Sequence, residues 1–244
     1  MACQAELGHP SFELFFAPYY DDRIAKIRCS KGHESTILLQ SQKFEVLLES
    51  GANALHEGFT LEAAATFSAA LERFTEFAAN VMLNHLGMTD SIYDEMFSEM
   101  ARQSERQIGS FLALHALVLE KAFIPNKDIA PFRNAVIHKG KIPTPQQVEK
   151  FCSDVYLEII QTLAPLKQKC PLSIHALIVK DLRTRSSKLP SGTRTITHSA
   201  AGLLSLADAE HKPSFEQAFN AYIVGVTKLK TALLNTRHEL RQVP

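Results

Sequence analysis

The segment 128–140 has the sequence DIAPFRNAVIHKG, and both of its ends carry residue types that begin and end helices. Asp128 suits the N-cap position, and Pro131 fits a first turn, where a backbone N–H has no partner within the helix. Gly140 suits the C′ position, and a proline follows three residues later. The segment therefore predicts a short helix over about 129–139.

The chain on both sides of this segment shows apolar residues at helical spacing. Thr144 followed by Pro145 is typical of a helix start, and Ser214 suits the N-cap of a last helix. The apolar periodicity predicts helices over about 42–56, 60–86, 91–100, 105–122, 144–163 and 214–240. We therefore expect a mainly α fold.

The first 41 residues follow a different pattern. Short segments rich in Phe, Ile and alternating polar residues lie at 12–16, 23–29 and 35–39, with turn residues between them. This pattern predicts a small antiparallel β-meander. We accordingly expect three domains, with boundaries 1–41 for the meander, 42–170 for a helical domain and 171–244 for a C-terminal basic loop and helical extension.

Three polar residues of the central segment suit phosphodiester chemistry. Arg133 can hold a phosphate oxygen with its planar, permanently charged guanidinium, and His138 can transfer a proton near neutral pH. Asn134 can orient either of them. Five residues at 3.6 per turn place Arg133 and His138 about 140° apart on one helix. A second element or a second chain is therefore needed to make them converge.

The pattern Arg133-Asn134-x-x-x-His138 resembles the motif of the HEPN superfamily, the higher eukaryotes and prokaryotes nucleotide-binding domains. The resemblance extends over roughly 42–165 in the helical layout. It implies an α-helical domain, and in many members a metal-independent ribonuclease of toxin–antitoxin, phage-defence or RNA-processing systems. It also implies an active groove made by two copies of the motif across a dimer.

The resemblance implies catalytic roles for Arg133, Asn134 and His138, with RNA as the substrate, a homodimer as the assembly and an antitoxin or regulatory protein as a further partner. Lys127, Lys139 and Lys141 lie beside the motif and suit contacts to an RNA backbone. The alternative function is a non-catalytic helical module that binds a nucleotide, an RNA or a protein partner.

Two further features of the sequence that bear on the motif have competing interpretations. The stretch from Arg28 to His33 matches the same loose spacing, but Gly32 and the strand-like context argue against it. Glu72 or Glu76 can cross to Arg133 or His138 and orient it. We favour instead a solvated face with an Arg73–Glu76 pair.

Composition narrows the class of protein. The 244 residues are 45% hydrophobic and 21% charged, which is typical of a globular protein. An apolar run near 18 residues and a secretory signal pattern are both missing, so we expect a cytoplasmic protein without a membrane span. Residues 1–100 carry 6 Lys/Arg against 15 Asp/Glu, whereas residues 101–244 carry 20 against 11. Such asymmetry suits either a phosphate-facing surface or a self-complementary oligomer.

Four potential metal ligands lie near the N-terminus: Cys3, His9, Cys29 and His33. Two Cys and two His could make a tetrahedral zinc site, but the C-x2-C spacing of a strong zinc signal is missing. We therefore favour ordinary turn and strand residues and expect no metal and no cofactor. Further along, 172–182 suits helix or strand, and 180–194 is basic and reads as a mobile loop.

Overall fold

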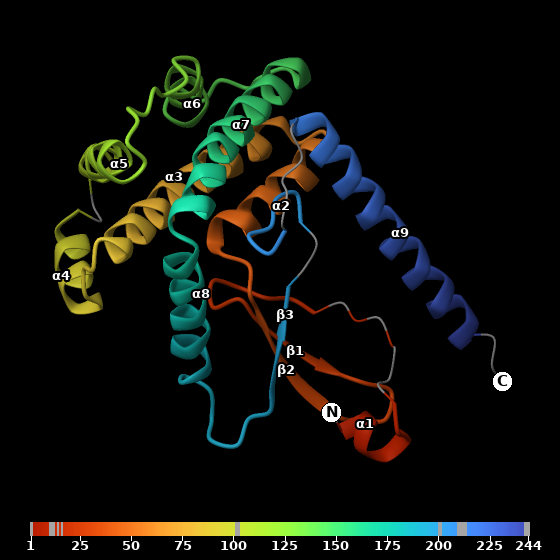
Figure 1. The fold of residues 1–244 in the computed structure, drawn as a ribbon. Helices are drawn as coiled ribbons and strands as arrows, with labels where there is room; N and C mark the ends of the chain where they lie inside the picture. The colour runs from red at the N-terminus through yellow and green to blue at the C-terminus, as the bar shows by residue number, and fades with distance from the viewer. Residues whose placement is uncertain are drawn as a thin grey trace. The chain divides into compact units, whose positions relative to one another are not determined.

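The fold is given by a computed structural model that describes residues 2–9, 13, 15, 17–100, 103–199, 202–208 and 214–241. It is mainly helical with a small three-stranded sheet, which confirms the expected fold class (Figure 1). The helices are α1 (Ala2–Leu7), α2 (Lys43–His56), α3 (Thr60–His85), α4 (Asp90–Met100), α5 (Ser104–Val118), α6 (Ile129–Ile137), α7 (Pro145–Lys169), α8 (Pro171–Ser186) and α9 (Phe215–Arg241). The strands are β1 (Ile24–Arg28), β2 (Glu34–Leu39) and β3 (Thr195–His198).

The chain forms two compact units. The helical unit comprises 42–178 and 201–223, and the sheet unit comprises 1–41, 179–200 and 224–244. The expected boundary between 41 and 42 is also a boundary between these units. Residues 171–244, expected as one C-terminal domain, are divided between the two units, with the divisions inside α8 and α9.

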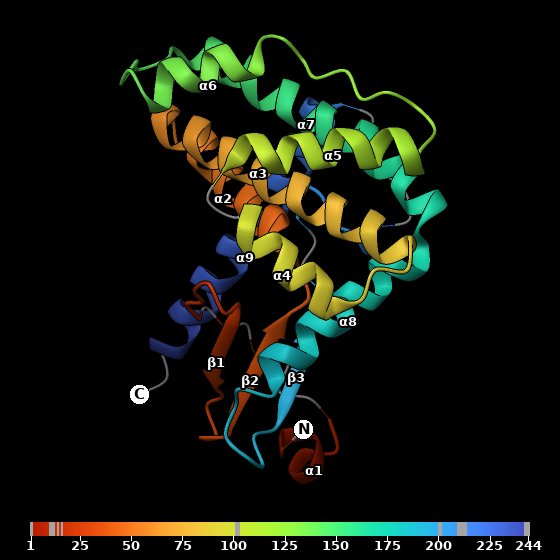
Figure 2. The ribbon, with the colours of Figure 1, turned by 90° about the vertical axis from the view of Figure 1, so that its left-hand side faces the viewer.

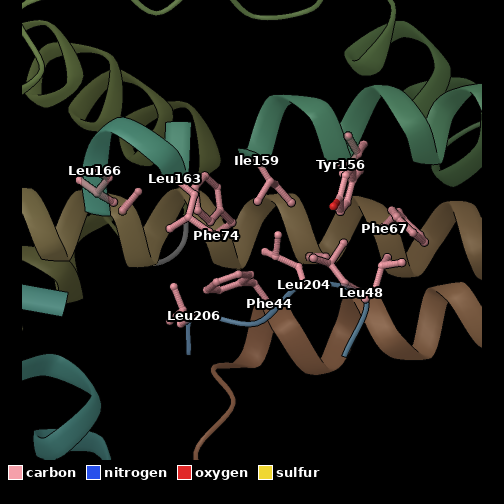
Figure 3. Close-up of a cluster of buried hydrophobic side chains, with 14 of the residues drawn as sticks. Phe44, Leu48, Phe67, Phe74, Tyr156, Ile159, Leu163, Leu166, Leu204 and Leu206 are labelled. Atoms are coloured by element: carbon pink, nitrogen blue, oxygen red, sulfur yellow. The ribbon is translucent and has the colours of Figure 1, made fainter. Parts of the chain in front are cut away.

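The helical unit is built around α3, which contacts α2, α4, α5, α6 and α7. Its core consists of apolar side chains from α2, α3, α7 and the segment before α9 (Figure 3). Those labelled in the figure are Phe44, Leu48, Phe67, Phe74, Tyr156, Ile159, Leu163, Leu166, Leu204 and Leu206. Burial of such side chains contributes roughly 1.5–3 kcal/mol each, so this core is the main source of stability for the unit.

Helix α7 begins where the sequence predicts and ends later. The Thr144 hydroxyl accepts a hydrogen bond from the backbone N–H of Gln147, whose side chain bonds back to the Thr144 backbone. The helix then continues through Pro165 to Lys169, so the predicted end near residue 163 is wrong. Leu163 and Leu166 are both fully buried on either side of this proline. Their packing outweighs the roughly 3 kcal/mol that an internal proline costs.

Helix α6 matches the predicted segment closely, although its N-terminal cap differs from the expectation. Asp128 occupies the N-cap position without making a side-chain capping bond, and its carboxylate instead pairs with Lys150 at 3.0 Å. Gly140 has a φ of +65°, and the N–H of Lys141 donates to the Ala135 carbonyl at 3.0 Å. Glycine suits this position after the helix end because it adopts the left-handed conformation without steric cost.

The sheet has the order β1-β2-β3 and is mixed (Figure 2). Strands β1 and β2 form the expected antiparallel hairpin, and β3 pairs with β2 in parallel, with Thr36 opposite Thr195. The expected strands 23–29 and 35–39 are therefore present as β1 and β2. The expectation of an all-antiparallel meander is wrong, because the remaining strand of the sheet is parallel and comes from the C-terminal part of the chain. Of the predicted strand 12–16, only residues 13 and 15 lie within the described residues, and neither is in a strand.

The expected mobile basic loop over 180–194 is wrong for its first half, because α8 extends to Ser186. Arg185 on this helix is 6% exposed and donates to Asp181 and to the carbonyl of Leu39 at the end of β2. Asp181 also pairs with Arg23 at 2.6 Å, next to the start of β1. Two buried arginines and one carboxylate therefore join the C-terminal half of α8 to the hairpin. In the described part of the chain, helices long and apolar enough to cross a bilayer are absent.

Candidate functional site

Helix α6 presents the motif residues, and its apolar side fixes how it lies. The Phe132 ring stacks on Phe151 of α7 with centroids 4.6 Å apart, and Val136 is 2% exposed. Ile129 is buried against the same core. Because α6 contacts both α3 and α7, its orientation in the helical unit is set by these three side chains.

Arg133 is held by a carboxylate of the central helix. One of its guanidinium nitrogens lies 2.5 Å from an oxygen of Glu72 on α3, and both side chains are partly exposed, at 32% and 41%. The Arg73–Glu76 pair that we favoured from the sequence also forms, at 2.5 Å. Glu72 therefore crosses to Arg133, so the solvated face that we favoured is wrong for Glu72. That this contact orients a catalytic arginine stays a prediction.

Arg133 and Glu72 line a cavity of about 190 Å³ between α3, α5, α6 and α7. Much of its wall is apolar, with Phe111, Ile108 and Phe123 on the α5 side. Its polar groups come from Glu72, Thr75, Gln107, Asn126, Arg133, Glu158, Ser68 and Thr162. An apolar cavity with a few convergent polar groups is a common form of ligand site.

Glu158 is the second carboxylate in the wall of this cavity. One of its oxygens accepts the backbone N–H of Asn126 at 2.8 Å. Burial raises the pKa of Glu158 and the charge of Asp154 raises it further, whereas the hydrogen bond from Asn126 acts in the opposite direction. The net effect is a raised pKa, so this group takes up a proton at a higher pH than an exposed glutamate does.

The remaining motif residues lie at the surface. Asn134 and His138 are exposed, and His138 is not among the residues that line the cavity. In the part of the chain that the structure describes, the His138 imidazole makes no hydrogen bond or ion pair; its backbone N–H donates to the Asn134 carbonyl at 3.1 Å. One helix thus directs Arg133 inward and leaves His138 in solvent, as the 140° between them predicts.

The three lysines expected to hold RNA, Lys127, Lys139 and Lys141, are all exposed. Lys127 precedes α6 and the other two follow it, so they flank both ends of the motif helix in sequence. Sequence reasoning missed the cavity and its Glu158, which lies on α7, 25 residues after Arg133. The signal in the sequence that could have indicated the cavity is the apolar character of 105–122 on much of its surface, which includes Phe111.

The structure also brings together three of the four potential metal ligands. The Sγ atoms of Cys3 and Cys29 and a ring nitrogen of His33 lie within 4.8 Å of one another, whereas His9 is outside this group. Cys3 comes from α1, and the other two lie at the turn between β1 and β2. All three belong to the sheet unit, whereas the motif belongs to the helical unit.

Comparisons with known proteins add no relative for this chain. No protein-family description, curated protein or solved structure matches it. The resemblance to the HEPN superfamily therefore stays a prediction from the sequence.

Proposed function

We propose that this chain is a metal-independent endoribonuclease of the HEPN type. The observation that carries the proposal is the arrangement on α6, where Arg133 is fixed by Glu72 and the exposed Asn134 and His138 follow within five residues. A guanidinium held by one carboxylate keeps other donors for a phosphate, because arginine has five N–H groups. Exposure of the histidine is what proton exchange with a bound polymer requires.

The proposed reaction uses the 2′-hydroxyl of RNA as the nucleophile. The 2′-oxygen attacks phosphorus, the bond to the 5′-oxygen breaks, and the products are a 2′,3′-cyclic phosphate and a free 5′-hydroxyl. His138 transfers a proton from the nucleophile or to the leaving oxygen, and Arg133 stabilises the charge that develops on the phosphate oxygens. Asn134 orients His138 or the phosphate, and Lys127, Lys139 and Lys141 contact the RNA backbone.

The proposed assembly is a homodimer in which each arginine faces the other chain's histidine. Within one chain the two side chains diverge, so a second copy is needed to complete the site. Ile137 and Ile142, on either side of His138 in sequence, are 41% and 77% exposed and supply apolar surface for such an interface. A toxin or phage-defence effector, neutralised by an antitoxin, is the biological setting that this proposal implies.

The test compares motif variants with matched variants of the same unit. With EDTA present, the purified protein should cleave RNA to cyclic phosphate ends and leave DNA intact. Arg133→Ala and His138→Ala should each lower the rate by roughly 10²-fold or more. Arg73→Ala and the exposed His85→Ala should cleave at the rate of the unaltered protein.

Two results would contradict the proposal. One is cleavage that continues unchanged in both motif variants while circular dichroism shows them folded. The other is full activity from a species that light scattering shows to be monomeric at micromolar concentration. Glu72→Gln gives a graded check, because it keeps the shape of the side chain and removes the charge that fixes Arg133.

A second function is supported by the cavity beside Arg133. Its apolar wall, together with Arg133 and Glu158 in the lining, suits a flat ligand with polar edges, such as a nucleotide base. A non-catalytic module would bind such a ligand without cleaving it. Calorimetry with mononucleotides distinguishes the two functions. Binding that is lost in Arg133→Gln, together with no RNA cleavage by the unaltered protein, would favour the binding module.

A further inference from the structure

We propose that Cys3, Cys29 and His33 bind one zinc ion that ties α1 to the β1–β2 turn of the sheet unit. Cys29 and His33 are 26 and 30 residues from Cys3 in the sequence, and the fold brings the three ligand atoms within 4.8 Å of one another. Two thiolates and an imidazole are a ligand set that zinc prefers. The described chain supplies three ligands, which leaves a fourth position for a water molecule.

Two of the three distances between the ligand atoms are close to the edges of a zinc tetrahedron. Zinc binds sulfur at about 2.3 Å and nitrogen at about 2.0–2.1 Å, so a tetrahedral site places two sulfurs about 3.8 Å apart and a sulfur and a nitrogen about 3.5 Å apart. The Sγ atoms of Cys3 and Cys29 are 3.6 Å apart, and Cys3 Sγ lies 3.3 Å from His33 Nδ1. Small outward movements of these side chains therefore suffice to admit the ion.

The histidine is already oriented as a metal ligand. Its Nε2 lies 2.9 Å from a carboxylate oxygen of Glu6 on α1. When Nε2–H donates to this carboxylate, the lone pair of Nδ1 is left free and points toward the two sulfurs. A carboxylate on the distal nitrogen of a zinc-bound histidine is the usual outer partner in such sites.

The turn that carries Cys29 and His33 is closed by backbone hydrogen bonds. Gly32, with a φ of +84°, lets its N–H donate to the Cys29 carbonyl at 2.9 Å, and the Cys29 N–H donates to the His33 carbonyl at 3.0 Å. The turn therefore holds Cys29 and His33 close to each other.

The sheet unit has a physical need for such a link. The buried apolar cluster of the described chain contains no residue of this unit, whose buried apolar residues are Cys3, Ala25 and Leu38. Helix α1 has six residues, which is too short to be stable without tertiary contacts. Units with little apolar core are commonly held by metals or disulfides.

A disulfide between Cys3 and Cys29 is the competing outcome of the experiment. Both residues are free cysteines at 3.6 Å, well beyond the 2.03–2.05 Å of an S–S bond. A disulfide would also leave unused the imidazole, which lies 3.3 Å from the Cys3 sulfur. When zinc binds, both cysteines bind as thiolates, so the thiol proton that Cys3 donates to Cys29 and the thiol proton of Cys29 are released to solvent.

The experiment measures metal in the full chain purified under reducing conditions. Elemental analysis should find about one zinc per chain, and Cys29→Ser and His33→Ala should each retain less than a tenth of it. His9→Ala and Cys170→Ser, which change the same residue types outside the cluster, should keep the full amount. Circular dichroism shows whether the helical unit of each variant is folded.

A second measurement does not depend on any variant folding. Cobalt added to the metal-free protein should give a thiolate-to-metal charge-transfer band and the absorption of a tetrahedral ion, and one equivalent of zinc should remove both. The proposal is overturned by a chain that binds no stoichiometric zinc, by a Cys3–Cys29 disulfide in its place, or by cobalt without thiolate bands. Loss of zinc in His9→Ala would equally overturn the three-ligand assignment.

Discussion

The helical unit and the sheet unit are stabilised by different interactions. In the helical unit, side chains such as Phe44, Phe74 and Ile159 are at most 1% exposed and form one continuous core. In the sheet unit, the most buried large side chains include two arginines, Arg23 and Arg185, at 5% and 6% exposure. Apolar packing supports the first unit, and charged hydrogen bonds support the second.

This difference implies that the two units lose stability through different kinds of substitution. Apolar packing is non-directional and tolerates small displacements, whereas a buried charge that loses its partner leaves an uncompensated group. Apolar truncation should therefore damage the helical unit most, and loss of a single carboxylate should damage the sheet unit most. The following predictions test this contrast in order of expected effect.

The largest effect is expected for Phe74→Ala in α3. Phe74 is 1% exposed and packs edge-on against Phe44 with ring centroids 5.3 Å apart. Loss of a buried phenyl ring leaves a cavity, so the free energy of unfolding should fall by about 3–5 kcal/mol. Urea denaturation followed by the helical signal measures it. Phe59→Ala, at a side chain 58% exposed, should change the value by less than about 0.5 kcal/mol.

A somewhat smaller effect is expected for Asp181→Asn in the sheet unit. This change leaves Arg23 and Arg185 buried without their carboxylate, at a cost of about 2–4 kcal/mol. Hydrogen exchange should speed up at the β1 and β2 amides and stay unchanged in α3. Arg28→Gln removes an ion pair whose side chains are 67% and 70% exposed, and it should cost less than about 1 kcal/mol. Equal effects of the two changes would show that burial does not govern this unit.

The smallest effect is expected for Glu49→Gln, and it depends on pH. Burial, together with the charge of Glu45, raises the pKa of Glu49 from 4.5 to about 7. Between these values the native state holds a proton that the unfolded state releases, so stability falls as pH rises from about 4.5 to 7. The variant should be more stable than the unaltered protein by about 1–3 kcal/mol at pH 8, because its amide cannot ionise.

At pH 4 the glutamate and the glutamine should be equally stable, since both are then neutral. Thermal unfolding at the two pH values measures the difference. The exposed Glu62→Gln on α3 should leave the pH dependence unchanged. A variant that gained no stability at pH 8 would show that the Glu49 carboxylate reaches solvent in the native state.

Much of the helical unit could be predicted because its signals are local. Thr144 and Gln147 are three residues apart and define a helix start by themselves. Gly140 ends the turn after α6 because glycine readily adopts a positive φ. Pro165 shows the limit of such signals. A proline ordinarily ends a helix, and only the contacts of Leu163 and Leu166 with distant residues explain why α7 continues.

The sheet unit and the surroundings of the motif could not be predicted in the same way, because their partners are far apart in sequence. Arg23 and Asp181 are 158 residues apart, and Glu72 and Arg133 are 61 apart. Strand β3, which pairs with β2 in parallel, has only four residues, too few for a recognisable alternation of apolar and polar side chains. Cys3 and His33 do not show the short spacing of a metal-binding motif, because Cys3 lies on α1 and His33 lies in the turn between β1 and β2.

The pairing of β2 with β3 also fixes an order of events during synthesis of the chain. The ribosome makes β1 and β2 before the whole of 42–178, and only after both does it make the strand that completes the sheet. A lone two-stranded hairpin is marginally stable in water, so this hairpin spends most of translation with an open hydrogen-bonding edge. The helical segments emerging behind it can meanwhile collapse through their local contacts. The sheet that begins with β1 and β2 is therefore completed only after 42–178 has been made, and a nascent chain halted before residue 195 would expose that edge to other strands.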